Sequence, residues 1–311
     1  MNHADPRVAV EFTALMAMKS HARHFHLPPK GKISRLLSGR HGSKFRGRGM
    51  NFEEFRHYQL GDDIRTLDWQ VTLRTGEPHV RVYTEEREQP VILCVDQRSS
   101  MFFSSVDTMK SVVAAQVSAC CAWKVIKDSD RVGALLFGDR DLHWYKPQRN
   151  PSHVSRILRS LSTLNQSLTH FDGTNSRESG GISRALAKLV RLKLKGSLLV
   201  FVSDFTELTE DDAAKLRWLK QHNDVLGVSI QDPMESELHI PQTLCLSDGE
   251  VQATVDSDVN RLLSGYNAQL NEEKRRVNRL IQNGGVPVIE LDTKGEHIAD
   301  FVKQISGGHF V

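Results

Sequence analysis

The sequence predicts an α/β fold in which a mostly parallel sheet carries helices on both of its faces. From Pro90 onward, short apolar runs alternate with longer segments of helical periodicity, a pattern typical of strands joined by crossover helices. The runs are apolar at nearly every position, as expected for strands that are buried on both sides. At 311 residues, the chain is long enough to bury such a core without disulfide bonds.

Five apolar runs are the predicted strands, and five periodic segments are the predicted helices. The short polar segment 141–146 fits an edge strand, with an antiparallel direction as one option. The strands are expected at 91–96, 131–137, 197–203, 224–230 and 286–291, and the helices at about 105–127, 151–163, 179–194, 210–222 and 257–283.

Two regions of different composition precede this domain, which we place at 90–306. Residues 1–46 are predicted to be a basic helical arm, and residues 47–89 to be a region of short strands and turns rich in Arg and Asp. From Phe12 to Phe52 there are nine cations and no acidic residue. The other residues carry 32 cations and 38 anions, a net charge of −6, so a basic arm is joined to a mildly acidic body.

The basic arm admits three interpretations. It could be a solvated terminus, a docking element for an acidic protein surface, or a nucleic-acid contact. Nucleic-acid binding is the least favoured, because Phe25 and Phe45 are the only aromatic residues between Phe12 and Phe52 on which bases could stack.

The region 47–89 holds closely spaced residues of opposite charge together with aromatic residues. Arginine forms bidentate bonds to carboxylates, so internal pairing into a brace is expected; a recognition surface for a partner is the alternative. The residues concerned are Arg56, Tyr58, Asp62, Asp63, Arg65, Asp68, Trp69 and Arg74.

The cysteines and the lengths of the apolar runs indicate the cellular compartment of the protein. The four cysteines lack C-x-x-C spacing and two of them are adjacent in an apolar pattern, which indicates reduced core residues. No run reaches the roughly 18 apolar residues that cross a bilayer, and the N-terminal sequence lacks the order of a signal peptide. We therefore expect a cytoplasmic protein without a membrane span.

Oxygen-bearing side chains follow two of the predicted strands. Asp96 ends the first strand and is followed by Ser99 and Ser100, Asp204 follows the strand 197–203, and Thr174 lies in a loop before a helix. Ligands of open α/β sheets bind beyond the carboxyl ends of the strands. Such oxygens suit Mg²⁺ or Mn²⁺, but the same residues also cap helices.

This set resembles the metal-ion-dependent adhesion site of von Willebrand factor A-type domains, written D-x-S-x-S with a later threonine and aspartate. Asp96, Ser100, Thr174 and Asp204 match that pattern, and Arg98 replaces its first serine. More specifically, FRHYQLGDDIRTLDWQVTLRTGEPHVRVYTEERE, VILCVD, SSM, FGD and QDPMESEL resemble the bacterial domain-of-unknown-function 58 (DUF58) family. The resemblance implies a von Willebrand A-like fold and a protein-binding role beside a MoxR-type AAA+ ATPase.

Arg98 decides how the oxygen cluster works. A guanidinium is always charged and would repel a dication a few ångströms away. If Arg98 points inward, it pairs with Asp96 or Asp204; if it points outward, Ser99 or water could replace the missing oxygen. A metal site, an internal ion-pair cluster and a simple capping turn therefore all stay open.

Three functions are consistent with these residues. The first is a non-enzymatic interaction module, an adaptor or chaperone-like partner of a MoxR-type ATPase that binds through the strand-end surface. The second is a metal-dependent hydrolase using Asp96 and Asp204. The third is a nucleic-acid-binding regulator acting through the arm.

Overall fold

The computed structural model describes residues 5–28, 50–59, 62–85, 89–170, 180–235, 243–247, 252–256 and 260–307. The chain divides into two compact units. Residues 1–39 and 89–311 form the main unit, and residues 40–88 form the second unit. Each unit is described by itself.

The main unit is built on a six-stranded sheet with the order β10-β7-β6-β3-β4-β5. All neighbouring strands are parallel except β5, which pairs antiparallel with β4 at the edge. The predicted fold class is confirmed. The strands are β3 (Val91–Asp96), β4 (Val132–Phe137), β5 (Leu142–Gln148), β6 (Leu198–Ser203), β7 (Asp224–Gln231) and β10 (Val288–Asp292).

The strand order places a topological switch point in the middle of the sheet. The chain adds β4 and β5 on one side of β3, and then returns to add β6, β7 and β10 on the other side. Val95 pairs with Val202 across β3 and β6, so Asp96 and Ser203, the last residues of these strands, lie at the same height. A doubly wound sheet forms its ligand crevice at this point.

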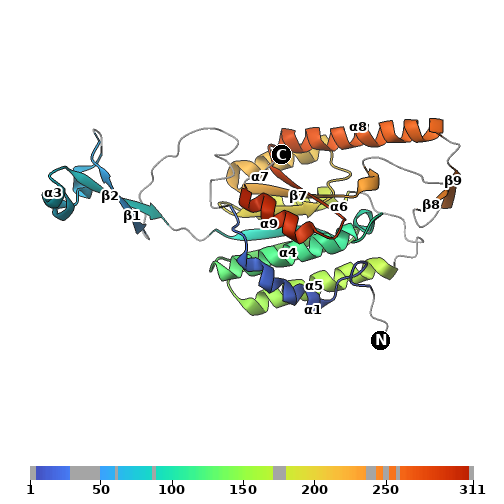
Figure 1. Ribbon diagram of the computed structural model, residues 1–311, viewed down its shortest axis with the longest axis horizontal. Coiled ribbons are helices and arrows are strands. Elements are labelled where there is room, and N and C mark those ends of the chain that lie inside the picture. Colours follow the sequence, from blue (N-terminus) through green and yellow to red (C-terminus); the bar gives the residue numbers. More distant parts are fainter. Residues whose placement is uncertain are drawn as a thin grey trace. The chain divides into compact units, whose positions relative to one another are not determined.

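Helices cover both faces of the sheet, as Figure 1 shows. One hydrophobic core joins the sheet to the N-terminal helices and to α4, α5 and α9, and a second core joins the opposite face to α6, α7 and α8. α4 is buried around nearly its whole circumference, as its apolar sequence predicts. The helices are α1 (Phe12–Ala17), η1 (Met18–Arg23), α4 (Lys110–Lys127), α5 (Pro151–Ser167), α6 (Gly181–Leu192), α7 (Glu210–His222), α8 (Asn260–Gly284) and α9 (His297–Gly307).

The main departure from the predicted helices lies before α4, which begins at Lys110 rather than near residue 105. The loop before it is held by other strands: Ser105 N donates to Asp232 Oδ2 over 2.8 Å, and Thr108 N donates to the Thr293 carbonyl over 3.0 Å. These bonds satisfy N–H groups of the loop and hold residues 105–108 outside the helix. The structure also contains an unpredicted hairpin of β8 (Thr243–Ser247) and β9 (Gln252–Asp256).

The first part of the basic arm is a packed element. Leu15, Ala22 and Phe25 are buried in the core, and Trp123 Nε1 of α4 donates to the Leu15 carbonyl over 3.4 Å. Phe25 meets the ring of Phe301 in α9 edge to face, with 5.4 Å between the centroids. The solvated-terminus interpretation therefore does not hold for residues 12–25.

The second unit pairs β1 (Met50–His57) with β2 (His79–Glu85) in an antiparallel ribbon. Between them lie a short 3₁₀ helix, η2 (Ile64–Thr66), and α3 (Trp69–Thr75), where only strands and turns were expected. Asp63 accepts from Arg65 N and Asp68 accepts from Val71 N, so these two carboxylates cap the two helices. Gly76, with φ of +77°, ends α3.

Two findings concern the cysteines and the membrane. Cys94, Cys120 and Cys121 are free thiols and are buried. None of the helices within the described ranges combines the length and the apolar content that a bilayer crossing requires.

The buried carboxylate of Asp212 ties α7 to α6 and gives a first prediction. It accepts hydrogen bonds from Thr209 in the capping box and from Ser183 of α6, at 2.8 and 2.5 Å, and pairs with Lys215 at 2.9 Å. Burial by itself raises its pKa, but the bonds from Ser183, Lys215 and Thr209 outweigh burial and lower it. The unfolded chain therefore binds this proton more readily than the folded chain does.

We expect the free energy of unfolding to fall as the pH drops below about 4, and the fall to be shallower in Asp212→Asn. Urea unfolding at a series of acidic pH values measures this. Asp211→Asn is the control, because the Asp211 side chain in the same helical turn is 78% exposed. Equal slopes for the wild type and Asp212→Asn would contradict the assignment.

Candidate functional site

The site lies at the switch point, where β3 and β6 end. Asp96 is fully buried and Asp204 is 7% exposed. Ser203 Oγ donates to Asp96 Oδ2 over 2.6 Å, which links the two strand ends directly. The fold thus brings together Asp96 and Asp204, as the sequence predicted.

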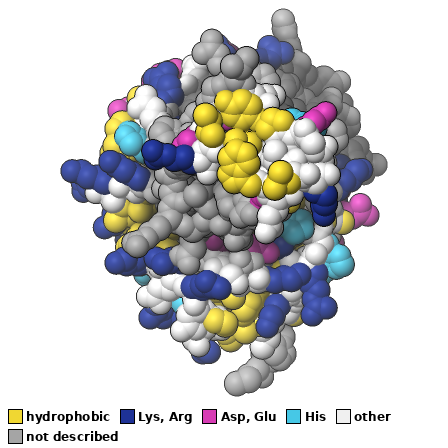
Figure 2. Space-filling view, turned by 90° about the vertical axis from the view of Figure 1, so that its left-hand side faces the viewer, with side chains coloured by type: hydrophobic (Ala, Val, Ile, Leu, Met, Phe, Trp, Pro, Cys, Tyr) yellow, Lys and Arg dark blue, Asp and Glu magenta, His cyan; other side chains and the backbone are white. Residues whose placement is uncertain are grey.

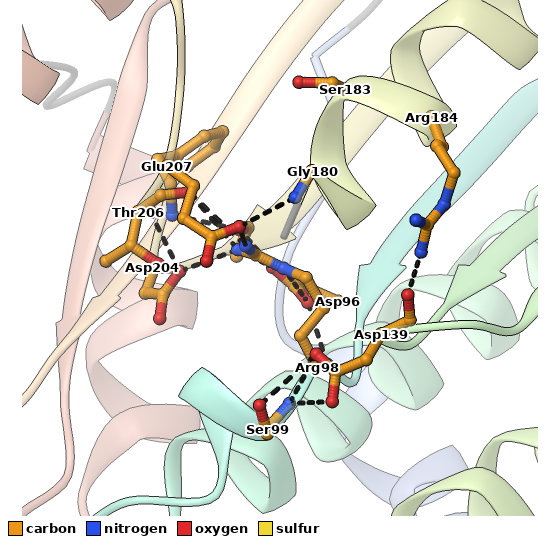
Figure 3. A network of polar contacts seen from close by, with 12 residues as sticks. Asp96, Arg98, Ser99, Asp139, Gly180, Ser183, Arg184, Asp204, Thr206 and Glu207 are labelled. Carbon is orange, nitrogen blue, oxygen red and sulfur yellow. Dashed lines mark hydrogen bonds and ion pairs between the residues drawn. The ribbon is translucent and has the colours of Figure 1, made fainter. Parts of the chain in front are cut away.

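Arg98 points inward and lies between these two carboxylates (Figure 3). Its Nη2 is 2.7 Å from Asp96 Oδ2 and 3.1 Å from Asp204 Oδ1, and its Nε is 3.0 Å from Asp96 Oδ1. Nη1 donates to Glu207 Oε2 over 3.0 Å. The side chain is only 2% exposed, so the guanidinium is an internal part of the site.

A second cation, Lys110, enters the cluster from the first turn of α4. Its Nζ is 3.1 Å from Asp204 Oδ2 and also pairs with Glu235, which follows β7. The Lys110 side chain is 1% exposed. Two buried monovalent cations therefore neutralise Asp96 and Asp204, while Glu207 and Glu235 reach the cluster from its exposed side with side chains 46% and 33% exposed.

Burial and ion pairing oppose each other in this cluster. Burial by itself lowers the pKa of Arg98 and of Lys110, but the carboxylates around each cation outweigh it and raise both pKa values. For Asp204, burial alone would raise the pKa, yet the charges of Lys110 and Arg98 leave it below its usual range. Burial raises the pKa of Asp96, and the charge of Arg98 opposes that shift without cancelling it.

As placed, the residues do not fit a divalent metal ion. Both oxygens of Asp96 bind Arg98, and one of them also binds Ser203. Asp204 Oδ1 accepts from Arg98 and from Thr206, and Oδ2 binds Lys110. A dication on these oxygens would lie within a few ångströms of two buried positive charges. The geometry favours the internal ion-pair interpretation over the metal site and the capping turn.

Ser99 and Ser100 take no part in this pairing. Ser99 turns toward Asp139, which follows β4, and its backbone N–H lies 3.2 Å from both carboxylate oxygens. Ser100 Oγ is buried and has no hydrogen-bond partner among the described residues. Thr174 lies outside the described residues.

The start of α6 fits closely against Arg98. A Cβ atom added at Gly181 would lie 2.6 Å from Arg98 Cδ and 3.1 Å from the Gly138 carbonyl. Gly180 N donates to Glu207 Oε2 over 3.2 Å, so the same carboxylate touches Arg98 and the beginning of α6. Glu207 itself has a φ of +66°, a conformation that non-glycine residues rarely adopt.

Sequence reasoning missed Lys110, Glu207 and Glu235 as members of the cluster. Lys110 is the one cation before a long run without charge, up to Lys124, in this buried helix, which is a usable signal. Glu235 lies in the QDPMESEL segment and Glu207 follows the second strand end, but no spacing rule links either of them to Arg98.

A cavity of about 150 Å³ adjoins the cluster. Asp204, Thr206, Gln231 and Glu235 line it from the strand ends. Residues of α8 close the other side: Leu270, Glu273, Lys274, Val277 and Asn278.

The Arg/Asp-rich residues of the second unit are partly paired, as predicted. Arg56 Nη2 binds both oxygens of Asp62, at 2.9 and 2.8 Å. Tyr58 is half-buried, and Arg65 and Arg74 are exposed. Trp69 is 63% exposed, in contrast to the buried position that a structural brace would give it.

Hydrophobic side chains gather on the surface of the second unit, as Figure 2 shows. Ile64, Trp69 and Leu73 are 63%, 63% and 83% exposed, and Phe55 is 43% exposed. Large apolar groups grouped on a surface typically mark an interaction site. This favours the partner-surface alternative for that part of the region.

The fold and site together define a doubly wound α/β domain with a buried ion-pair cluster at its switch point. The family model described as "Protein of unknown function DUF58" matches residues 54–276, and the chain belongs to this family.

Relatives and solved structures extend the comparison. The chain is 27% identical to uncharacterized proteins of Mycobacterium bovis and Mycobacterium tuberculosis, over 91% of its own length and 87% of theirs. Among solved structures, it is similar to the conserved hypothetical protein BatB from Bacteroides thetaiotaomicron, with 13% identity, a TM-score of 0.41, and coverage of 70% of this chain and 98% of that one. The manganese-loaded TRAP protein of Plasmodium vivax shares 14% identity with a TM-score of 0.32, covering 72% and 74% of the two chains.

Removing the Arg98 charge gives a second prediction. Arg98→Met leaves Asp96 and Asp204 buried without their shared counterion, and we expect a loss of about 3–5 kcal/mol in the free energy of unfolding. Urea unfolding at neutral pH measures it. Arg7→Met is a matched control, because Arg7 also bridges two carboxylates, Asp5 and Asp107, but is 57% exposed, so its loss should leave the free energy of unfolding nearly unchanged. A similar small loss for Arg98→Met would show that the cluster is not a buried counterion site.

Proposed function

We propose that this protein is a non-enzymatic protein-interaction module whose strand-end surface works without a bound metal, as an adaptor or chaperone-like partner of a MoxR-type AAA+ ATPase. The observation that carries the proposal is Arg98, which with Lys110 satisfies the carboxylates that a metal or a substrate would otherwise use. The ATPase as partner rests on the family resemblance, and a cytoplasmic location follows from it.

The rim of the strand-end surface has the composition of a protein contact. Phe103 and Val106, in the loop between β3 and α4, are 38% and 56% exposed. The ammonium of Lys110 lies 6.0 Å from the centroid of the Phe103 ring. Apolar side chains beside partly exposed Glu207 and Glu235 offer both burial and charge to a partner.

The hydrolase hypothesis gains no support from this geometry. Asp96 and Asp204 are buried and bound to cations, so neither is free to activate water or to bind a catalytic metal. The arm beyond residue 28, on which the nucleic-acid hypothesis rests, lies outside the described residues.

Capture of the partner tests the binding role. The full chain, crosslinked in the cells that produce it and then purified, should recover a MoxR-type AAA+ ATPase. Phe103→Ser combined with Val106→Ser should reduce the recovery about tenfold, because interface energy is concentrated in a few apolar contacts. Quantitative mass spectrometry of the captured proteins measures this.

The control is Ile64→Ser combined with Leu73→Ser, two exposed apolar residues of the second unit. A loss of capture in this variant alone would move the binding surface to the second unit. Recovery of no AAA+ ATPase with the wild-type chain would contradict the proposed partner.

Metal independence is tested by restoring the serine of the adhesion-site pattern. Mg²⁺ or Mn²⁺ at millimolar concentration should leave the thermal unfolding temperature of the wild type unchanged. Arg98→Ser should lower that temperature, and Mn²⁺ should recover part of the loss, because a dication can then replace the missing positive charge. A metal-dependent rise in the wild type would refute the resident-cation proposal.

A further inference from the structure

A second and larger cavity lies at the opposite end of the main unit. α4 begins at Lys110 in the strand-end site and, after 18 residues in all, ends at Lys127, shortly before β4 begins. Its last turns line a cavity of about 860 Å³ together with η1 and the start of α5. The lining residues are Lys19, Ser20, Ala22, Arg23, His24, Trp123, Ile126, Lys127 and Pro151.

The lining of this cavity carries positive charge. Lys19, Arg23 and Lys127 are exposed, and no described lining residue is a carboxylate. None of these three cations forms an ion pair within the described part of the chain. The nearest carboxylate in sequence, Asp128, binds the buried ammonium of Lys124 over 2.9 Å.

The cations are held on packed elements. η1 is anchored by Ala22, and the segment after it by Phe25, each 1% exposed. Lys19 Nζ lies 5.2 Å from the centroid of the Trp123 ring, which keeps its stem against α4. A site whose charges are already positioned loses little entropy when a ligand binds.

The sequence that follows extends the same charge. Residues 29–49 contain the other seven of the nine cations between Phe12 and Phe52, and they contain no acidic residue. The sequence after Pro28 thus carries charge of the same sign as η1.

We propose that this cationic cavity, lined by η1 and the ends of α4 and α5, docks an Asp- or Glu-rich segment of a partner protein. Charge complementarity argues for an acidic ligand. A nucleic acid is less well suited, because Trp123, the one Phe, Tyr or Trp side chain in the described lining, is 4% exposed and offers no free face for a base. The inference stands apart from the strand-end proposal, since it concerns the other end of the sheet.

Fluorescence anisotropy of a labelled polyglutamate peptide, titrated with the full chain at fixed ionic strength, tests the docking site. Arg23→Glu combined with Lys127→Glu should weaken binding about tenfold. The control is Arg191→Glu combined with Arg217→Glu, which changes net charge equally through exposed residues of α6 and α7 on the other face of the sheet. This control should bind nearly as well as the wild type.

Equal weakening by the two charge reversals would overturn the proposal, because net charge alone would then explain binding. The proposal would also be overturned if the peptide did not bind. The same holds if a single-stranded oligonucleotide bound more tightly than the peptide and displaced it. Thermal unfolding shows whether each variant is folded. If Arg23→Glu with Lys127→Glu fails to fold, Arg23→Gln with Lys127→Gln provides a milder variant. The ATPase takes no part in the assay, so its outcome is separate from that of the capture experiment.

Discussion

The contact between Arg98 and the two strand-end carboxylates is the constraint on which the site depends. Asp96 ends β3 and Asp204 directly follows the adjacent β6, and two buried like charges so close together would repel each other strongly in a medium of low dielectric constant. The planar guanidinium meets both and satisfies their oxygens with directed hydrogen bonds. Because removing one partner of a buried pair leaves an uncompensated charge, each member of the cluster fixes the others in place.

The cluster also organises the loops that form the surface. Glu207 connects Arg98 to the first backbone N–H before α6, and Asp139 holds Ser99. Asp232, at the end of β7, accepts from Ser105 in the loop between β3 and α4 and from Thr293 after β10, the latter over 2.6 Å. Loops from five parallel strands are thus tied by carboxylates to one another, and the surface they present is positioned by the core beneath it.

The sheet was predictable from sequence because its strands are apolar throughout. The closeness of Asp96 and Asp204 was predictable because the carboxyl ends of adjacent parallel strands lie at the same edge of a sheet. The direction of Arg98 was not predictable, because both orientations satisfy the local sequence. Lys110 and Asp204 are 94 positions apart, and no local pattern links them. α3 was missed because it is short and keeps Trp69 and Leu73 exposed, so the apolar periodicity that marks a packed helix is absent. Thr174 stays a prediction.

Arg98 and Lys110 together carry the same formal charge as one divalent ion, but the two charges are attached to the chain. A metal site can be emptied, and its open coordination position exchanges ligands; these cations cannot leave, and their inner contacts are sealed from solvent. The charge of the proposed binding surface is therefore independent of metal concentration. Any change in its affinity for a partner must come from the exposed rim, where Glu207 and Glu235 can exchange their contacts without opening the buried pair beneath them.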